Sequence, residues 1–497
     1  MRWKQSRILS AGGALAMLAS LIVAAVPATA SGAPAPQSIS WAPCVEDASA
    51  QCGTFQVPVD WAHPKGPKID LVVARRVATD PSARIGTLIF GPGGPGGPGR
   101  TLAINGGSGF TEEVRRRFDI LSFDPRGWGQ SSPIACSLDR ANQLGPLIDA
   151  MSSQADFNHV VAQSRALADD CRARSGSVFD HMDTRQTVYD IDALRAAVGD
   201  PRLTFYGGSY GTMMAHQYAE TYPDKVRAIV ADSNLDHSLD GRSYAVTTAA
   251  AEQDAFNEFV AGCGSNPSCP LYGRNIRQFW TRLLDRATRG ELLDADDPDA
   301  EIRPTNLIGY VVGELYHDPR VWPEIAAELV SLDEGRPSGR SVGFAPGVPG
   351  QPDITFPFVQ LPVWCQDWTR PASTYAEWTS LMAAIRAAAP DLVRTPAHSV
   401  CLGWPTAPTN PPHRLVARNT AKVLLVNSLH DPSTGYQWAQ GMAAQYGSRA
   451  VLLTYEGWGH IAHGRSPCID SAIHEYLISG QPPAPGTRCP AIVPSGT

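Results

Sequence analysis

The chain has 497 residues, of which 43% are hydrophobic and 18% are charged, so it can bury a large core and is too long for one minimal domain. We therefore expect a main domain that carries a sizeable insertion. The formal net charge of -7 is spread along the chain, with no basic stripe of the kind that binds nucleic acid, so no nucleic-acid partner is predicted.

The first thirty residues have the features of a secretory leader. Arg2, Lys4 and Arg7 form a positive segment, residues 8–26 are apolar, and Ala28-Thr29-Ala30 fits a cleavage site. A small, proline-rich stretch follows without a basic stop-transfer cluster. We expect a signal peptide at residues 1–30, secretion to the extracellular space, and no stable membrane association after cleavage.

Ten cysteines, an even number, suggest disulfides in an exported chain. Connectivity does not follow from sequence, and our hypothesis is that neighbours pair: Cys44 with Cys52, Cys136 with Cys171, Cys263 with Cys269, Cys365 with Cys401, and Cys468 with Cys489. No two cysteines have C-x2-C spacing and no paired histidines accompany them, so we expect no metal site. No cofactor is predicted either.

Residues 53–60 and 69–74 have the character of antiparallel strands that open a sheet. The apolar strand 86–90 then leads into residues 91–99, which are glycine and proline only. Such a loop lets backbone N–H groups approach a ligand closely, as an oxyanion hole requires. A phosphate-binding loop is the rival interpretation, but the lysine and Ser/Thr of a Walker sequence are missing. A plain flexible linker is a further alternative.

The strand 118–123 leads into a loop that contains Asp124 and Arg126. We expect these two residues to hold the loop together by charge-assisted hydrogen bonds rather than to take part in chemistry. An amphipathic helix is predicted at 183–198.

Residues 203–218 combine a short strand, the sequence Gly207-Gly208-Ser209-Tyr210-Gly211 and a helix. This is the G-x-S-x-G nucleophile elbow, which presents a serine on a strained turn between strand and helix. Ser209 is the first candidate nucleophile. The alternative is a tight turn whose serine only caps the next helix.

A buried strand at 226–231 follows, and the β-α-β-α-β order predicts a mostly parallel sheet with helices on both faces. From 235 to 418 the pattern changes to helical patches separated by Pro/Gly-rich loops, notably 335–352 and 406–412. We interpret residues 235–418 as a helical cap inserted into a sheet domain formed by 31–234 and 419–497. The expected patches are 249–260, 276–287, 307–316, 322–332 and 375–388.

The sheet resumes with strands at 422–427 and 450–454, and each is followed by a candidate catalytic residue. Asp431 lies just beyond the first strand and His460 lies in a glycine-rich loop beyond the second. A serine hydroxyl needs a base, and that base needs an orienting acid, in the chain order Ser, Asp, His. Asp232 is the competing acid and His463 the competing base. For Asp431 a turn-capping role is the alternative, and His216 is expected to pack or face solvent.

These motifs together resemble the proline-iminopeptidase family of α/β-hydrolases, and more narrowly the secreted tripeptidyl aminopeptidases of filamentous soil actinobacteria. The resemblance rests on residues 207–212, 93–96 and 124–131, the Asp431-Pro432 loop and Gly459-His460. It implies that Ser209 attacks, His460 transfers the proton, Asp431 orients the ring, and the N–H groups of Gly94 and Tyr210 hold the oxyanion. Pro92 stands where relatives usually carry histidine, which we expect to alter the loop shape more than the chemistry.

The resemblance also implies a serine aminopeptidase whose cap binds the free N-terminal amine of a peptide through acidic side chains. The candidates are Glu252, Asp254, Glu258, Glu314 and Asp367, and Glu252, Glu314 and Asp367 are taken as the substrate-binding set. We expect a monomer that releases tripeptides or other short peptides. A carboxylesterase or lipase with the same triad, a prolyl aminopeptidase, and a non-catalytic binding protein are the alternatives.

Overall fold

The computed structural model describes residues 38–97, 99–106, 109–293, 301–336, 355–356, 358 and 360–493. The predicted signal peptide and all but the first two residues of the predicted loop 335–352 lie outside these residues. In the described part of the chain, no helix combines the length and the apolar character needed to cross a membrane.

A ten-stranded sheet forms the centre of the fold, in the order β1-β2-β3-β5-β4-β7-β8-β10-β11-β12. The pairs β1–β2, β2–β3 and β3–β5 are antiparallel, and all remaining pairs of this sheet are parallel. This confirms the predicted mostly parallel sheet with an antiparallel opening. The strands are β1 (Ala42–Pro43), β2 (Gln51–Pro58), β3 (Lys68–Arg76), β4 (Gly86–Gly91), β5 (Phe118–Phe123), β7 (Leu203–Gly208), β8 (Val226–Asp232), β10 (Val423–His430), β11 (Ala450–Trp458) and β12 (Arg488–Cys489).

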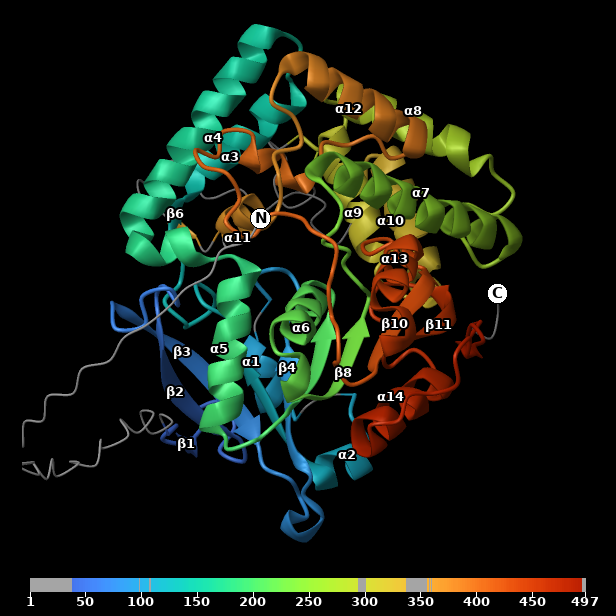
Figure 1. The fold of residues 1–497 in the computed structure, drawn as a ribbon. Coiled ribbons are helices and arrows are strands. Elements are labelled where there is room, and N and C mark those ends of the chain that lie inside the picture. The colour runs from blue at the N-terminus through green and yellow to red at the C-terminus, as the bar shows by residue number, and fades with distance from the viewer. Residues whose placement is uncertain are drawn as a thin grey trace, which may run out of the picture. The chain divides into compact units, whose positions relative to one another are not determined.

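Helices cover both faces of the sheet because successive strand residues point to opposite sides. Ile89 and Leu121 face the core under α5 (Thr184–Ala197), α6 (Tyr210–Thr221) and α13 (Tyr436–Tyr446). Their neighbours Leu88 and Ile120 face the core under α2 (Glu112–Arg117) and α14 (Pro467–Ser479). The short helix α1 (Gly99–Ile104) packs near β3. The parallel strands are therefore buried on both sides, and their carboxyl ends point towards the remaining helices (Figure 1).

These remaining helices come from two segments of the chain. They are α3 (Leu138–Asp149), α4 (Gln154–Ser175), α7 (Gly241–Ser265), α8 (Ile276–Thr288), α9 (Pro304–Glu314), α10 (Trp322–Asp333), α11 (Gln360–Asp367) and α12 (Tyr375–Ala388). The sequence predicted only the second segment, but α3 and α4 lie beside α11 and α12 (Figure 1). Gly403 donates its N–H to Ser164 Oγ at 3.0 Å, and β6 (Cys136–Ser137) pairs with β9 (Thr355–Phe356). The cap boundaries at 235 and 418 stay a prediction.

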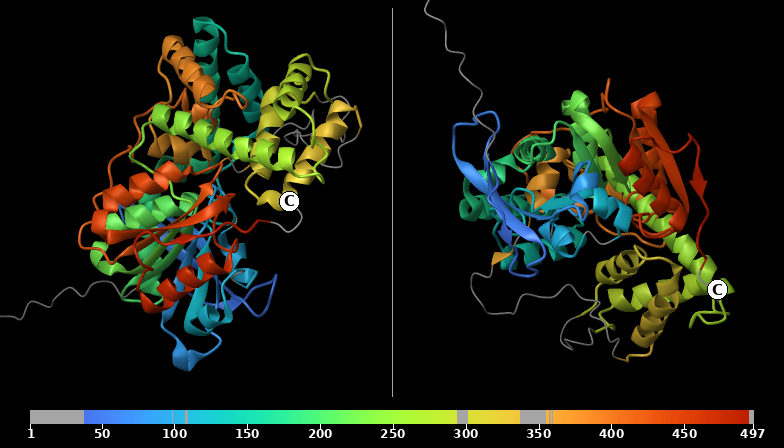
Figure 2. Two further views of the ribbon diagram at one scale, coloured as in Figure 1. Left: turned by 90° about the vertical axis from the view of Figure 1, so that its right-hand side faces the viewer. Right: turned by 90° about the horizontal axis from the view of Figure 1, so that it is seen from below.

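α8, α9 and α10 gather at the far end of the long helix α7, away from α3 and α4 (Figure 2). Short 3-10 helices complete the fold at Pro81–Ala83, Gly176–His181, Pro223–Lys225, Pro319–Val321, Ala397–Cys401 and Gly447–Arg449. All five predicted disulfides are present. Cys136–Cys171 links β6 to α4, and Cys365–Cys401 links α11 to the 3-10 turn that ends at Cys401.

Candidate active site

Ser209 occupies a strained turn between β7 and α6, as the elbow motif predicts. Its backbone has φ 55° and ψ -122°, a region that residues other than glycine rarely adopt. The flanking glycines are sterically required. A Cβ at Gly207 would lie 2.3 Å from the carbonyl oxygen of Gly211, and one at Gly211 would lie 2.3 Å from the carbonyl oxygen of Gly91. The turn therefore holds the serine side chain at the carboxyl end of the strand.

Ser209 and His460 line one pocket of about 500 Å³. Its other lining residues are Phe90, Pro92, Gly93, Gly94, Gly97, Leu102, Tyr206, Gly208, Tyr316, Ser433 and Ile461. The pocket is therefore bounded by the glycine-rich loop, the elbow, the His460 loop and Tyr316, which follows α9.

Asp431 and His460 are in direct contact. The Nδ1 atom of His460 lies 3.0 Å from each carboxylate oxygen of Asp431, and both side chains are largely buried. Burial alone would raise the pKa of Asp431, but the electrostatic interaction with His460 and the hydrogen bonds from His460, Thr434 and Ser233 outweigh it and lower this pKa. Asp431 is thus an anion placed to hold the imidazole with Nδ1 protonated, which leaves Nε2 as the acceptor.

Several further donors fix the Asp431 carboxylate. The N–H groups of Ser433 and Thr434 donate to Oδ1 at 2.8 and 2.9 Å, and the hydroxyls of Ser233 and Thr434 donate to Oδ2 at 2.7 and 2.9 Å. Ser233 also accepts the N–H of Ile461 at 2.8 Å. Sequence reasoning missed Ser233, although its position directly after a buried strand was a usable signal.

The glycine-rich loop passes close to Ser209. A Cβ at Gly93 would lie 3.1 Å from the Cβ of Ser209, and Gly94 has φ 116°, which favours glycine. Tyr210 is the first residue of α6, so its N–H has no acceptor within the helix. The glycine-rich loop and the start of α6 thus both lie next to Ser209, and the oxyanion role of Gly94 and Tyr210 stays a prediction.

Comparison with known proteins gives matches along most of the chain. The family described as "alpha/beta hydrolase fold" matches residues 86–318, and the one described as "TAP-like protein" matches residues 388–489. Serine protease Hip1 of Mycobacterium tuberculosis is 30% identical over 497 residues, which cover 91% of each chain. The chain belongs to the α/β-hydrolase family of serine peptidases.

Two other relatives carry different names. A protein named carboxylesterase B from Mycobacterium tuberculosis is 31% identical over 92% of this chain and 91% of its own. A tripeptidyl aminopeptidase of Streptomyces lividans is 28% identical over 91% of this chain and 86% of its own. The resemblance and the fold class inferred from the sequence are therefore confirmed, and this α/β-hydrolase is a serine hydrolase of the peptidase group.

Asp232 and His463, the competing acid and base of this hydrolase, have partners other than Asp431 and His460. Asp232 accepts the N–H groups of Ala462 and His463, both at 2.9 Å, and the hydroxyl of Tyr206 at 2.7 Å. The Nε2 atom of His463 lies 2.9 Å from Nε2 of His474. Asp232 thus anchors the loop that carries His460, and His463 points towards α14 rather than towards Asp431.

Arg465 and Tyr316 also shape the His460 loop of the hydrolase. Arg465 donates to the carbonyl oxygens of Ile461, His460 and Tyr316 at 2.6 to 2.7 Å. Gly459 has φ 89°, a left-handed conformation that favours glycine. The ring of Tyr316 packs 4.9 Å from that of His460, and the N–H of His460 donates to the Tyr316 carbonyl at 2.9 Å. Nothing in the sequence around Tyr316 indicates this contact.

Asp124 and Arg126 form hydrogen bonds within the fold, as the sequence predicts for their loop. Asp124 accepts the N–H groups of Arg100 and Gln130, both at 3.0 Å. Arg126 is buried and forms two hydrogen bonds to Asp190, at 2.7 and 2.8 Å. The two residues hold different segments together, and neither lines the pocket of Ser209.

Two of the predicted substrate-binding acids are engaged elsewhere. Glu252 is buried and forms a bidentate ion pair with Arg394. Asp367 is fully buried, accepts bonds from Thr184 and Asn410, and has a pKa raised to about 8 by burial. Both carboxylates are buried and paired within the fold, so these contacts do not support the predicted amine-binding role.

Three other predicted acids are more accessible. Glu314 ends α9 and is half-buried. On α7, Asp254 bonds to Nδ1 of His430 at 2.8 Å and is 50% exposed, and Glu258 accepts the indole N–H of Trp458 at 2.8 Å and is 32% exposed. His430 directly precedes Asp431, so the acids of α7 lie close to the Asp431 loop.

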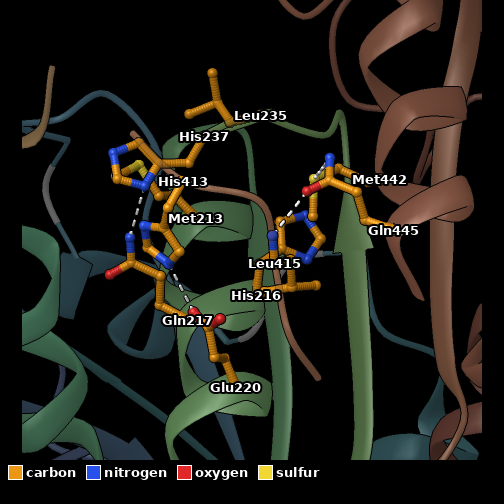
Figure 3. Close-up of a pocket in the computed structure, with 10 residues that line it drawn as sticks. All are labelled: Met213, His216, Gln217, Glu220, Leu235, His237, His413, Leu415, Met442 and Gln445. Carbon is orange, nitrogen blue, oxygen red and sulfur yellow. Dashed lines mark hydrogen bonds and ion pairs between the residues drawn. The ribbon is translucent and has the colours of Figure 1, made fainter. Parts of the chain in front are cut away.

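A second hollow lies between α6 and α13 (Figure 3). Figure 3 shows Gln217 directed at His237 and Glu220 directed at His413, with distances of 3.1 and 2.9 Å. Its volume is only about 10 Å³, enough for about one water. His216 is buried beside it, as the packing role predicts. This hollow serves packing rather than substrate binding.

Proposed function

We propose that this chain is a secreted serine exopeptidase that releases tripeptides or other short peptides from the free N-termini of its substrates. Ser209 is the nucleophile, His460 the general base and Asp431 the orienting acid. The observation that carries the proposal is the contact of His460 Nδ1 with both oxygens of Asp431, at 3.0 Å, while His460 and Ser209 line one pocket. The names of Hip1 and of the Streptomyces aminopeptidase support the peptidase reaction.

In this mechanism Nε2 of His460 takes the proton of the Ser209 hydroxyl as Oγ attacks the peptide carbonyl carbon. The negative charge that develops on the carbonyl oxygen is held by the N–H groups of Gly94 and Tyr210. The imidazolium, stabilised by Asp431, then gives its proton to the leaving amine nitrogen as the C–N bond breaks. Water attacks the acyl-enzyme by the same route, which frees the short peptide and restores the serine.

The exopeptidase character requires a group that binds the substrate amine. Asp254 and Glu258 are the predicted acids best suited to this, because they are partly exposed on α7 and lie beside His430. In the proposed organisation residues 235–418 form the cap and limit the length of peptide that reaches Ser209. The disulfides of the described chain and the leader-like sequence at 1–30 support secretion.

The test compares tripeptidyl 4-nitroanilides with free and acetylated N-termini. We expect kcat/KM to fall by at least roughly 100-fold on acetylation, because the ammonium group loses its charged partner. Asp254→Asn and Glu258→Gln should reduce the difference between free and acetylated substrates. Glu456→Gln is the matched control, since Glu456 is also partly exposed but pairs with Arg488. Equal rates for free and acetylated substrates would reject the exopeptidase proposal.

The triad assignment has its own matched pair of variants. His460→Gln should lower kcat by about 10⁴-fold or more, as loss of a triad member does in serine peptidases. His463→Gln should retain most activity, because His463 contacts His474 rather than Asp431. Ser209→Ala should abolish acyl-enzyme formation, detected by mass spectrometry. The assignment fails if His463→Gln is the more damaging change.

A carboxylesterase is the second candidate function. It is favoured by the relative named carboxylesterase B and by the apolar lining of the Ser209 pocket. Such an enzyme would cleave 4-nitrophenyl esters of simple acids with a higher kcat/KM than any peptide anilide. A prolyl aminopeptidase would be revealed by a higher kcat/KM for a peptide substrate with N-terminal proline than for a tripeptide substrate that lacks proline.

A further inference from the structure

One wall of the Ser209 pocket is built from apolar side chains. Phe90 at the end of β4, Leu102 in α1 and Tyr206 in β7 all line it. Phe90 and Leu102 remain partly exposed although they are apolar. The ring of Phe90 stacks on that of Tyr206 with a centroid distance of 4.9 Å. The wall therefore presents aliphatic and aromatic surface to whatever binds beside Ser209.

The polar end of Tyr206 does not alter this character. Its hydroxyl donates to Asp232 Oδ2 at 2.7 Å, and the side chain is almost fully buried. Asp232 also accepts two backbone N–H groups at 2.9 Å. The hydroxyl is thus held inside the fold and is already paired with Asp232.

Charge is missing from the described lining of this pocket. No carboxylate, ammonium or guanidinium group is among these residues, and His460 is their one histidine. A charged substrate side chain in this space would lose its water without gaining a partner, which is costly. The volume of about 500 Å³ is enough for a large side chain.

The position of His460 indicates which part of the substrate meets the apolar wall. In the proposed reaction the imidazole gives its proton to the leaving amine, so the leaving group lies on the side of His460 and Tyr316. The acyl part then lies on the side of the glycine-rich loop, where Phe90 and Leu102 are found.

The geometry points to an acyl-side subsite, formed by Phe90, Leu102 and Tyr206, that selects an uncharged, large apolar side chain on the residue whose carbonyl carbon is attacked. This assignment rests on the proposed function and specifies its substrate class. The preferred substrates are peptides in which the last residue of the released fragment is phenylalanine or leucine. Peptides in which this residue is aspartate or lysine are rejected.

The first experiment uses the wild-type enzyme and 4-nitroanilides of Ala-Ala-Phe, Ala-Ala-Leu, Ala-Ala-Lys and Ala-Ala-Asp, all with free N-termini. We expect kcat/KM for the phenylalanine and leucine substrates to exceed that for the charged ones by at least roughly 100-fold. A charged substrate cleaved as fast as the phenylalanine one would overturn the subsite.

The second experiment places a carboxylate in the wall. Leu102→Glu should raise the ratio of kcat/KM for the lysine substrate to that for the phenylalanine substrate at least 10-fold, because the new anion pairs with the ammonium. Leu284→Glu is the matched control, since Leu284 is a half-buried leucine on α8 outside the pocket. An unchanged ratio in a folded Leu102→Glu enzyme would overturn the assignment.

A third arm separates this subsite from the peptidase proposal. If the enzyme cleaves 4-nitrophenyl esters but no peptide, the exopeptidase proposal fails. The subsite can still be tested, because it predicts that the valerate ester is cleaved at least 10-fold faster than the anionic glutarate monoester. Equal rates for these two esters would overturn the subsite. Failure on both peptides and esters would overturn both proposals.

Discussion

The hydroxyl of Ser233 donates to Oδ2 of Asp431 at 2.7 Å while accepting the N–H of Ile461 at 2.8 Å. Ser233 is fully buried and has φ 65°, an unusual conformation for a residue other than glycine. One side chain at the end of β8 therefore connects the acid of the proposed triad with the loop that carries His460. Strain of this kind persists only where the surrounding structure imposes it.

Ser233→Ala is expected to lower kcat by roughly 10- to 100-fold, with a smaller effect on KM. The change removes a hydrogen bond to an anion, worth about 1.5 to 3 kcal/mol, and leaves the Ile461 N–H unpaired, which costs about 1 to 3 kcal/mol. The pH profile of kcat should shift as well, because Asp431 loses a donor that lowers its pKa. Steady-state kinetics from pH 5 to 9 provide the measurement.

Ser428→Ala is the matched control for this change. Ser428 is also fully buried, and its hydroxyl has no hydrogen-bond partner among the described residues. A kinetic loss of the same size in Ser428→Ala would show that the Ser233 effect is a general response of the core. Ser233→Gly, which suits φ 65° but lacks the hydroxyl, should behave like Ser233→Ala.

The residues that sequence reasoning located share one property, which is that their signal is local. The elbow occupies five consecutive positions around Ser209, and Asp431 and His460 each follow a recognisable strand. Tyr316 could not be placed in this way, because its role arises from a contact with His460, which is far along the chain. Ser233 does follow a buried strand, but nothing local indicates which distant residue its hydroxyl contacts. Long-range contacts of this kind leave no periodic pattern in the chain.

The helical region shows the same limit. α7, α8 and α12 were predicted because apolar residues recur at helical spacing. α4 was not predicted, since polar and charged side chains occupy most of its 22 positions and its buried face is narrow. The roles of the cap acids could not be predicted for another reason. The sequence does not show whether a carboxylate such as Glu252 is free or paired with a distant residue such as Arg394.

A second prediction concerns Asp232, which anchors the His460 loop without touching His460. Asp232→Asn should lower kcat by about 10-fold or more. Both carboxylate oxygens of Asp232 accept hydrogen bonds, from the N–H groups of Ala462 and His463 and from the Tyr206 hydroxyl. In asparagine one of these oxygens is replaced by an NH2 group, which donates and cannot accept. The kinetic change should come with increased hydrogen exchange at residues 461–463. Native exchange rates there would show that the loop does not depend on Asp232.

A third prediction follows from four buried histidines, His216, His237, His398 and His474. Burial lowers the pKa of each to about 4, from an ordinary value of 6.5. Between these pH values the unfolded chain binds protons that the folded protein excludes, so stability falls as the pH falls from about 6.5 towards 4. Each histidine can contribute up to about 3 kcal/mol of this loss.

Urea unfolding at pH 7.5, 6.0 and 5.0 measures this dependence. His398→Phe should give a shallower pH dependence than the wild type, because it removes one of the four groups and keeps the ring volume. Its free energy of unfolding at pH 7.5 serves as the internal control for packing. A wild-type stability that stays constant from pH 7.5 to 5.0 would contradict the lowered pKa values.

The final prediction compares two disulfides that close loops of different length. Cys136 and Cys171 are 35 residues apart, whereas Cys44 and Cys52 are 8 residues apart. Loop-closure entropy assigns about 4 kcal/mol to the longer link and about 2.5 kcal/mol to the shorter one. Replacing both cysteines of each pair by serine should therefore destabilise the Cys136–Cys171 variant more, as measured by chemical unfolding at pH 7.5.

The longer link also joins β6 to α4, so its loss should lower the protease resistance of residues 138–175 first. A variant of Cys44 and Cys52 that is the less stable of the two would show that local packing, rather than chain entropy, sets the contribution of these bonds.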